Sequence, residues 1–457
     1  MIILATPIVS VDSNRQALPS GGIYGAYQLG NDTLANDVRN AGISHITRLF
    51  RWEQIEPEQD VFHFNGIDTW IDEVLKRNNL YAIVLLRTGQ CWATDNSYDP
   101  ELGIPLHEFA SAPPLDYDDY YDYIYTIVNH LNGRVNHFII ENDPLTRYSW
   151  YATPEEYKQL VSVAYQAAKA ANPKCVVIGN KFPAMGFAHL IARDLYDHGL
   201  EQEAIDFWNG YNSRRTLNFQ VETIEELLEF LNSDFSLWIS NFADVILMPD
   251  QAQNLDAIGF NYYLQYSYID EVVAWLYFRM NMNGYSLPLW DLEHGIKDER
   301  NVVSDFAAAG ELVKGYVTAK SLGIQNISWY PFTIDTSGHN YEDLKPMYDF
   351  ENQELLPTYY AMMVLSDHLS PYHLIQDVFE SIYVRYSFEN VLTGRVDLEA
   401  IWSDSVEAPI DILFRRPATQ AIVTHLFGIP AETVANSNDT LVVEVNSSPL
   451  YIKWIYD

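Results

Sequence analysis

Apolar segments of strand length alternate along the first 370 residues with segments whose apolar positions recur every three to four residues. The first kind predicts β-strands and the second amphipathic helices. We predict strands at residues 21–27, 44–50, 80–86, 136–142, 174–180, 256–262, 287–293 and 325–331. We predict helices at residues 32–41, 65–77, 118–132, 154–171, 222–232, 268–281, 305–322 and 356–367. Eight strand–helix repeats are the pattern of a closed (β/α)8 barrel, a TIM barrel of the α/β class.

The longest interruption of this pattern is the segment 181–255, between the fifth and sixth predicted strands. It holds the predicted helix 222–232 and is the largest insertion in the barrel. Loops at one end of such a barrel surround its mouth. We therefore predict that this insertion forms one wall of a cleft.

The pattern changes after about residue 370, where turn residues separate short apolar segments and no helical period is visible. Four of these segments have strand length: 381–388, 398–402, 421–427 and 441–445. We predict two domains, a catalytic-type barrel domain at 1–370 and a small all-β, sandwich-like domain at 371–457. Residues 1–19 contain a candidate strand near 2–9 that could pair with the β domain.

Composition limits the kinds of ligand and partner that we expect for this protein. Of the 457 residues, 48% are hydrophobic and 19% are charged, which is ordinary for a soluble globular protein. The 27 basic and 62 acidic residues give a formal charge of −35, and such a surface repels phosphate backbones, so we expect no nucleic-acid partner. The 32 Tyr and 11 Trp suit polyhydroxylated ligands because they combine an apolar face with a polar tip. Packing on the barrel exterior is an equally weighted alternative.

Targeting and cofactor signals are absent from the sequence. No apolar segment reaches transmembrane length, and the first residues lack the basic and apolar regions of a signal peptide. We expect a soluble protein, cytoplasmic or extracellular. The 12 His and two Cys show no metal-ligand spacing, so we expect no metal and no cofactor. We place Cys91 and Cys175 on different strands and expect no disulfide between them.

Two acidic residues occupy the ends of separated barrel strands. Asp143 follows the fourth predicted strand, in the run HFIIENDP (137–144), and Glu293 ends the seventh, in LPLWDLEHG (287–295). The C-terminal ends of barrel strands carry catalytic groups, so both carboxyls should face the mouth. A retaining glycosidase uses two carboxyls about 5–5.5 Å apart, one as nucleophile and one to protonate the leaving oxygen.

Further motifs strengthen this interpretation by their order and spacing. They are GISHITRLFRW (42–52), IEP (55–57), NDP (142–144), TPEEY (153–157), KAANP (169–173), NYY (261–263), LEHG (292–295), ISWY (327–330) and PLYI (449–452). With them the chain resembles clan A of the retaining glycoside hydrolases, the xylosidase- and cellulase-like (β/α)8 barrels with a C-terminal β domain. In that clan the fourth strand ends in Asn-Glu-Pro and the seventh in a nucleophilic glutamate. The resemblance covers nearly the whole chain.

The resemblance implies roles for polar residues at the mouth. Glu293 would attack the anomeric carbon as the nucleophile, and Asn142 would hydrogen-bond the 2-hydroxyl of the substrate. Arg48 would hold Glu293 ionised, since a neighbouring cation lowers the pKa of a carboxyl. Arg51 is the alternative match for this arginine.

The resemblance also implies contacts of aromatic side chains with the nucleophile and with the sugar. Tyr262 or Tyr263 would touch the nucleophile, and Trp329 would stack against the sugar. Trp92 and Trp150 are candidates for the walls of further subsites. For each aromatic side chain, packing in the core or in a loop is the alternative.

Asp143 departs from the clan, which has glutamate at this position. Its side chain is one methylene shorter, which moves the carboxyl about 1 Å from the scissile oxygen, and misplacement of that size can cost on the order of 10²-fold in rate. The backbone could advance to compensate, a wider gap could admit water and allow inversion, or acid catalysis could be lost. Glu141, two residues earlier on the same side of the strand, is a weaker candidate for a substitute acid.

We therefore expect a glycoside hydrolase that cleaves O-glycosidic bonds in an oligosaccharide or glycoside by retaining double displacement. Glu293 is the expected nucleophile and Asp143 a non-standard acid/base. The alternative, raised by Asp143, is a catalytically degenerate barrel that serves carbohydrate binding or a structural role in an assembly.

Overall fold

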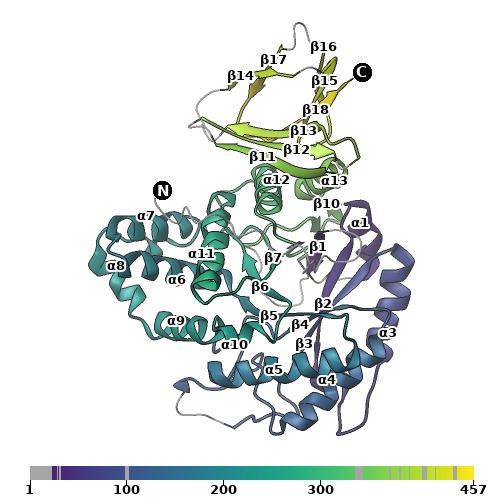
Figure 1. Ribbon diagram of the computed structural model, residues 1–457, viewed down its shortest axis with the longest axis vertical. Helices are drawn as coiled ribbons and strands as arrows, with labels where there is room; N and C mark the ends of the chain where they lie inside the picture. Colours follow the sequence, from purple (N-terminus) through teal and green to yellow (C-terminus); the bar gives the residue numbers. More distant parts are fainter. Residues whose placement is uncertain are drawn as a thin grey trace.

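Eight parallel strands close into a barrel at the centre of the molecule (Figure 1). The computed structural model describes residues 23–27, 29, 32–97, 102–334, 343–369, 372–379, 382–390, 392–403, 409–416, 418–435 and 440–456. The barrel strands are β1 (Tyr24–Tyr27), β2 (His45–Arg51), β3 (Tyr81–Arg87), β4 (His137–Ile140), β5 (Val176–Phe182), β6 (Ala257–Tyr262), β7 (Leu289–His294) and β8 (Asn326–Trp329). Each pairs with the next, and β1 also pairs with β8. The predicted fold class is confirmed.

Helices surround this barrel. They are η1 (Asp32–Leu34), α1 (Ala35–Asn40), α2 (Trp52–Ile55), α3 (Asn65–Thr69), η2 (Trp70–Leu75), η3 (Lys76–Asn78), α4 (Tyr117–Leu131), α5 (Pro154–Ala171), η6 (Tyr266–Tyr268), α11 (Ile269–Met282), α12 (Asp305–Ser321) and α13 (Pro357–Leu369). Helix α5 begins and ends where the sequence predicts. The Thr153 side chain accepts from the Glu156 N–H, and the Glu156 side chain accepts from the Thr153 N–H, which closes a capping box.

The segment between β5 and β6 is richer in helix than expected. It holds α6 (Ala184–Asp197), α7 (Glu201–Tyr211), η5 (Leu217–Phe219), α8 (Ile224–Leu231), α9 (Asp234–Ile246) and α10 (Pro249–Ala252). The predicted helix at 222–232 exists as α8, but α6 takes the place beside β6, and α8 packs on α6, α7 and α9. Figure 1 shows these helices on the outer side of the barrel.

Side chains alternate between the inside and the outside of the barrel, as in any β-strand. The interior holds a small apolar cluster that includes Leu85, Ile139, Ile178 and Trp290. The outer face of the strands belongs to a much larger core shared with the helices. Side-chain parity therefore decides which residues at the strand ends can reach the mouth.

The chain after α13 is a module of antiparallel strands. A six-stranded sheet contains β11 (Tyr372–Phe379), β12 (Tyr383–Asn390), β13 (Val396–Ser403), β18 (Leu450–Ile455), β15 (Gln420–His425) and β16 (Pro430–Ala435) in that order. A two-stranded sheet pairs β14 (Ile410–Arg415) with β17 (Thr440–Val445), and a separate hairpin of β9 (Tyr348–Asp349) and β10 (Glu354–Leu355) precedes α13. Apolar residues of β14, β15, β17 and β18 form a second core. The strands predicted in this region are confirmed, whereas the candidate strand near 2–9 lies outside the described residues.

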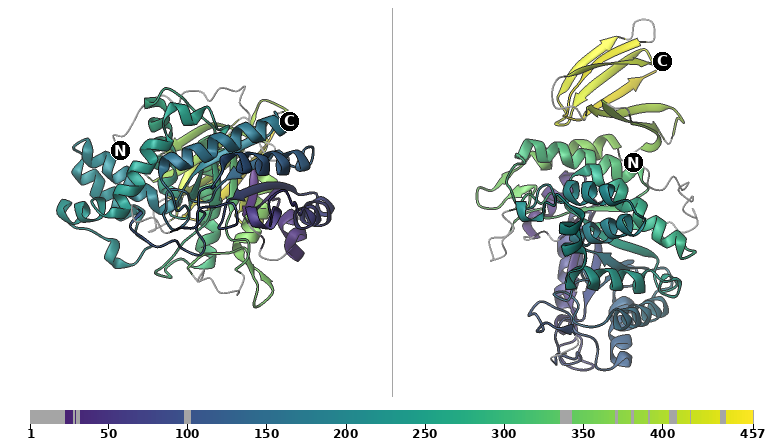
Figure 2. Two further views of the ribbon diagram at one scale, coloured as in Figure 1. Left: turned by 90° about the horizontal axis from the view of Figure 1, so that it is seen from below. Right: turned by 90° about the vertical axis from the view of Figure 1, so that its left-hand side faces the viewer.

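This module packs on the helix layer of the barrel beside α12 and α13, as Figures 1 and 2 show. The hydroxyls of Thr318 and Tyr386 lie 3.1 Å apart. The rings of His368 and Tyr451 stack with centroids 4.7 Å apart. Buried residues of β12 and β13 belong to the same core as the barrel helices, so the two parts share apolar packing.

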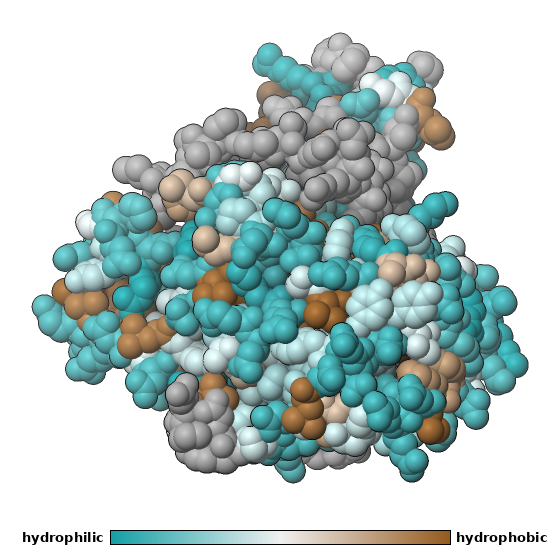
Figure 3. Space-filling view, turned by 60° about the horizontal axis from the view of Figure 1, so that its bottom comes forward, coloured by the Kyte–Doolittle hydropathy of each residue, from teal (hydrophilic) through white to brown (hydrophobic). Residues whose placement is uncertain are grey.

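The surface agrees with the acidic composition. Hydrophilic residues dominate the face in Figure 3, and the hydrophobic residues on it are scattered in small patches. No helix in the described part of the chain is long and apolar enough to cross a membrane, and no cluster of potential metal ligands occurs there. Cys91 and Cys175 are both free thiols. Cys91 lies in the loop after β3 and Cys175 just before β5, so neither is on a strand.

Candidate active site

A single buried ammonium group joins the carboxyl ends of several barrel strands. The side chain of Lys181, near the end of β5, is fully buried. Its Nζ donates to Oε1 of Glu293 on β7 and, at 2.5 Å, to Oδ1 of Asn142 after β4. It also lies 3.7 Å from Oδ1 of Asp143 and 4.8 Å from the ring centroid of Tyr27. The two candidate catalytic carboxyls are therefore close neighbours.

Glu293 is the more buried carboxyl, with a side chain 9% exposed against 22% for Asp143. Its Oε1 accepts from Lys181 and its Oε2 from the hydroxyl of Tyr263. Burial raises the pKa of Glu293 above its usual range; the Lys181 ammonium opposes this rise and the charge of Asp143 adds to it. Burial and the neighbouring Glu293 also raise the pKa of Tyr263, so its phenol stays protonated and donates.

Asp143 is held by two side-chain amides. Its Oδ1 accepts from Nδ2 of Asn261 at 2.8 Å, and its Oδ2 accepts from Nδ2 of Asn142 at 3.1 Å. The shared Lys181 ammonium keeps Oδ1 of Asp143 within about 6 Å of Oε1 of Glu293. This upper limit on the oxygen–oxygen distance admits the roughly 5–5.5 Å of retaining glycosidases and lies below the roughly 6.5–9.5 Å of inverting enzymes.

A bulge in β5 turns Lys181 toward the mouth. Strict alternation from Ile178, which is inside the barrel, would put Asn180 inside and Lys181 outside. The register between β5 and β6 instead shifts between residues 179 and 182, and Asn180 has a left-handed φ of +53°. The Asn180 amide donates outward to the Ile246 carbonyl on α9. The bulge thus takes Asn180 out of the alternation, and the side chain of Lys181 points into the barrel.

A similar irregularity in β7 orients Glu293. Leu292 belongs to the barrel interior, so alternation alone would turn Glu293 outward. The register between β7 and β8 shifts between Asp291 and His294. Two successive side chains, Leu292 and Glu293, therefore face inward.

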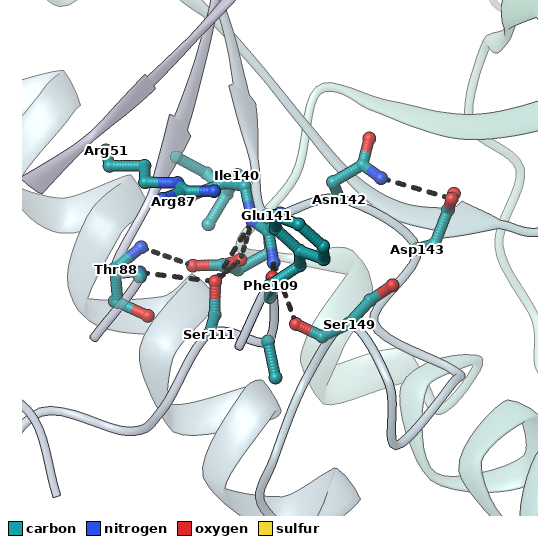
Figure 4. Close-up of polar contacts among 12 residues, drawn as sticks. Arg51, Arg87, Thr88, Phe109, Ser111, Ile140, Glu141, Asn142, Asp143 and Ser149 are labelled. Atoms are coloured by element: carbon teal, nitrogen blue, oxygen red, sulfur yellow. Dashed lines mark hydrogen bonds and ion pairs between the residues drawn. The ribbon is translucent and has the colours of Figure 1, made fainter. Parts of the chain in front are cut away.

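Glu141 is turned away from the candidate site, contrary to its expected orientation beside Asp143. Its Oε1 accepts from the backbone N–H of Thr88 at 2.6 Å, and its Oε2 accepts from the hydroxyl of Ser111 at 2.6 Å and from Nε of Arg87 at 3.4 Å. Figure 4 shows this carboxyl directed into that network, with Asp143 on the other side. The Glu141 side chain is fully buried and ion-paired, so it is no substitute acid.

The backbone at the end of β4 reverses between these two acids. Glu141 and Asp143 have left-handed φ angles of +62° and +48°, which costs about 1–2 kcal/mol per L-residue. Such strain persists where the surroundings fix it. Here Arg87 supplies the fixing contacts, because its NH2 also donates to the carbonyls of Phe109 at 2.8 Å and Ser149 at 2.9 Å. Two loops and the end of β4 are thus tied to one guanidinium.

Arg48 does not reach Glu293, so its expected role is wrong. Its parity on β2 points outward, and its guanidinium lies 3.4 Å from Asp32 and 5.5 Å from the ring centroid of Trp70. Arg51, the alternative, ends β2 and forms its ion pair within the following turn at 3.9 Å. The cation beside Glu293 comes from β5 instead.

Trp329 also faces the helices and not the mouth. It is fully buried, and its ring centroid lies 6.2 Å from that of Tyr316 on α12. Its expected contact with a sugar is therefore wrong. Tyr330, the next residue, packs against the apolar cluster inside the barrel, with its ring centroid 5.5 Å from that of Tyr27 and 6.1 Å from that of Tyr263.

The structure separates the other aromatic candidates into residues at the site and residues away from it. Tyr263 contacts the nucleophile candidate, whereas Tyr262 points outward and donates to the Gln265 carbonyl. Trp150 is fully buried, and its indole N–H donates to the carbonyl at the start of α5 at 3.2 Å, so it is a core residue and not a subsite wall. Trp92 is half-buried, and its indole N–H donates to the Glu56 carbonyl at 2.9 Å.

Four residues of the candidate site were not expected from the sequence: Tyr27, Lys181, Asn261 and Tyr330. Asn261 and Tyr330 lie in the motifs NYY and ISWY, but the resemblance assigns roles to the neighbouring residues Tyr262, Tyr263 and Trp329. Lys181 lies near the end of the strand VVIGNKF (176–182), which begins with apolar residues. A polar residue at the C-terminal end of an apolar barrel strand is a signal that could have identified it.

Comparisons with known proteins agree with this architecture. A family 39 glycoside hydrolase from the gut symbiont Bacteroides cellulosilyticus WH2 is similar in structure with a TM-score of 0.62 and 15% identity, covering 94% of this chain and 80% of that one. A GH30 endoxylanase from Clostridium papyrosolvens C71 has a TM-score of 0.59 and 13% identity, covering 96% and 97%. A monomeric β-xylosidase from Caulobacter crescentus CB15 has a TM-score of 0.58 and 11% identity, covering 97% and 98%.

These similar structures are glycoside hydrolases, and at such identities the likeness is one of fold. No protein-family model matches the sequence, and comparison with curated proteins finds no match. The chain therefore shares a (β/α)8 barrel with an attached β module with these enzymes, and any activity has to be argued from its own residues.

Proposed function

We propose that this protein is a glycoside hydrolase that cleaves O-glycosidic bonds with retention of configuration. The observation that supports it is the pair of carboxyls at the ends of β4 and β7, which lie within about 6 Å of each other. Glu293 is buried and accepts two hydrogen bonds, whereas Asp143 is partly open to solvent. Two carboxyls in different environments are what opposite roles in acid and nucleophilic catalysis require.

In the proposed reaction Glu293 attacks the anomeric carbon and forms a glycosyl ester, while Asp143 gives its proton to the leaving oxygen. Asp143 then takes a proton from water, whose oxygen attacks the same carbon and releases Glu293. Tyr263 and Lys181 neutralise the charge that returns to Glu293. Among the described side chains Asn261 Oδ1 is buried without a partner, and we assign it to a substrate hydroxyl.

The shorter side chain of Asp143 has a compensating feature in its backbone. The left-handed φ angles at residues 141 and 143 change the path of the chain just before the acid. Asn261 and Asn142 then hold the carboxyl on the side that faces Lys181 and Glu293. We propose that this path replaces the reach of the missing methylene.

A second candidate function is carbohydrate binding without turnover. It is favoured by one observation: both oxygens of Asp143 already accept hydrogen bonds from side-chain amides, those of Asn261 and Asn142, so both are engaged before a leaving group arrives. In this alternative the aromatic residues of the mouth would bind a sugar that is not cleaved.

Turnover of a panel of aryl glycosides, oligosaccharides and alkyl glycosides tests the proposal. We expect hydrolysis of at least one member, and the anomeric configuration of the first product, followed by NMR, should match that of the substrate. An inverted product would contradict double displacement. Sugar binding by calorimetry with no hydrolysis of any member would favour the second candidate function.

Removing the proposed acid should affect substrates according to their leaving groups. We expect Asp143→Ala to slow the hydrolysis of alkyl glycosides by about 10²–10⁴-fold, the usual contribution of general acid catalysis. Aryl glycosides with acidic leaving groups should lose much less, because their leaving oxygen needs little protonation. The measurement is kcat/KM for both classes with the same sugar. Equal losses for both classes would assign Asp143 another role.

The two neighbouring aromatic residues Trp329, at the end of β8, and Tyr330, directly after it, should behave differently. We expect Tyr330→Ala to lower kcat/KM about tenfold with little loss of stability, since one aromatic contact is worth about 0.5–1.5 kcal/mol. Trp329→Ala should instead lower the free energy of unfolding by about 3–5 kcal/mol, because it leaves a cavity in the core. Steady-state kinetics and urea unfolding measure the two effects. A selective kinetic defect in Trp329→Ala would restore Trp329 to the sugar site.

A further inference from the structure

We propose that Lys181 is the positioning residue of the site, holding Glu293 ionised for attack and fixing the orientation of Asn142. This inference rests on the proposed function of Glu293 and Asp143, and it gives Lys181 the role that Arg48 cannot fill. Lys181 acts through these residues, without bonding to the reacting atoms.

The contacts of Lys181 come from every element that faces it. Tyr27 of β1 presents its ring, and Asn142 and Asp143 after β4 present oxygens. Glu293 of β7 accepts directly. A fully buried ammonium is costly unless it is paired and hydrogen-bonded. These partners supply one contacting carboxylate, a second at 3.7 Å, an amide oxygen and a π face.

The ammonium also determines which way the Asn142 amide points. Asn142 Oδ1 accepts from Lys181 at 2.5 Å and from the hydroxyl of Tyr27 at 3.2 Å. Because both neighbours are donors, the oxygen must face them, and Nδ2 is left to donate to Asp143. Lys181 thus connects the nucleophile candidate to the acid candidate through one oriented amide.

Replacing Lys181 with Met keeps most of the side-chain volume and removes the charge. Burial and the charge of Asp143, which both raise the pKa of Glu293, would then be opposed by Tyr263 alone. We expect the acidic limb of the pH–rate profile to move to higher pH by about one unit or more, a tenfold or greater loss of rate on that limb. Lys181→Arg restores the charge and should move the limb back toward its position in the parent protein.

A readout independent of activity is the pH dependence of unfolding. A carboxyl whose pKa is higher in the folded state than in the unfolded state loses its stabilising contribution as pH rises from its ordinary value through the raised one. The stability of Lys181→Met relative to the parent protein should therefore fall from pH 5 to pH 8. Adding Glu293→Gln should remove this fall, because it removes the carboxyl that accepts directly from Lys181.

Lys169→Met is the matched control. Lys169 is also ion-paired, at 2.7 Å to Asp256, but this pair lies beside the N-terminal ends of β5 and β6, at the opposite end of the barrel. We expect this variant to lower stability without moving the pH–rate profile. An unmoved profile in Lys181→Met, or a fall in stability that persists in the double variant with Glu293→Gln, overturns the inference. No turnover by the parent protein overturns the proposed function, while the unfolding experiment still tests the Lys181–Glu293 link.

Discussion

Glu293→Gln should abolish glycoside hydrolysis, with kcat falling on the order of 10⁴–10⁶-fold, the range seen when a catalytic nucleophile is removed. An amide keeps the shape of the side chain but cannot form the glycosyl ester. Lys181 keeps its contacts with Asn142 and Asp143 in this variant, so we expect the protein to fold. The measurement is kcat on the best substrate of the panel, with circular dichroism and urea unfolding to verify the fold.

Glu399→Gln is the matched control for that experiment. Glu399 has a fully buried side chain and contacts Arg416, but it lies on β13 in the C-terminal module. Loss of this buried carboxylate should lower stability and leave kcat unchanged. If Glu293→Gln retains more than about a tenth of the parent rate, nucleophilic attack by Glu293 is ruled out.

The barrel could be predicted because the strand–helix pattern that indicates it recurs along the chain. Eight apolar strands alternate with amphipathic helices, and errors of a residue or two at the ends do not change the count. The helix at 222–232 shows the limit of this reasoning. The pattern predicts it as the barrel helix before the sixth strand, whereas α6 packs beside β6. Several helices in one insertion have equivalent periodicity, and only tertiary packing decides which of them covers the barrel.

Arg48 and Trp329 could have been judged from strand parity. Both were given roles by resemblance to a family motif, yet both occupy outward positions in regularly alternating strands. The aromatic residue that faces inward is Tyr330, directly after β8. A motif carries over a residue type and a position, whereas parity determines which side of the sheet that position faces.

For Lys181 and Glu293, strand parity alone predicts the wrong side-chain orientation. Both lie at register shifts that turn an outward position inward. A bulge depends on local backbone geometry and on contacts from distant elements, such as the Asn180 amide bound to α9. The sequence of a single chain does not reveal such contacts. Glu293 is predicted from its place at a strand end and from its motif, whereas no motif points to Lys181.

Arg87→Met should cause the largest loss of stability among the polar substitutions near the candidate site. It leaves Glu141 as a buried carboxylate without its cation, and breaking a buried ion pair in this way costs about 3–5 kcal/mol. The carbonyls of Phe109 and Ser149 lose their hydrogen bonds from the guanidinium as well, although Ser149 still accepts from the Ser111 N–H. Urea unfolding at neutral pH measures the loss.

The same substitution should reduce activity through Asp143. With Arg87 gone, the left-handed end of β4 keeps only the contacts of Glu141 with Thr88 and Ser111 as its ties to the two loops, and a displacement of about 1 Å in the acid can cost on the order of 10²-fold in rate. The double variant Arg87→Met, Glu141→Met replaces the ion pair by apolar groups, which is often close to neutral for stability. We expect it to recover much of the stability while activity stays low. Recovery of both would mean that the charge of Glu141, and not the tether through Arg87, positions Asp143.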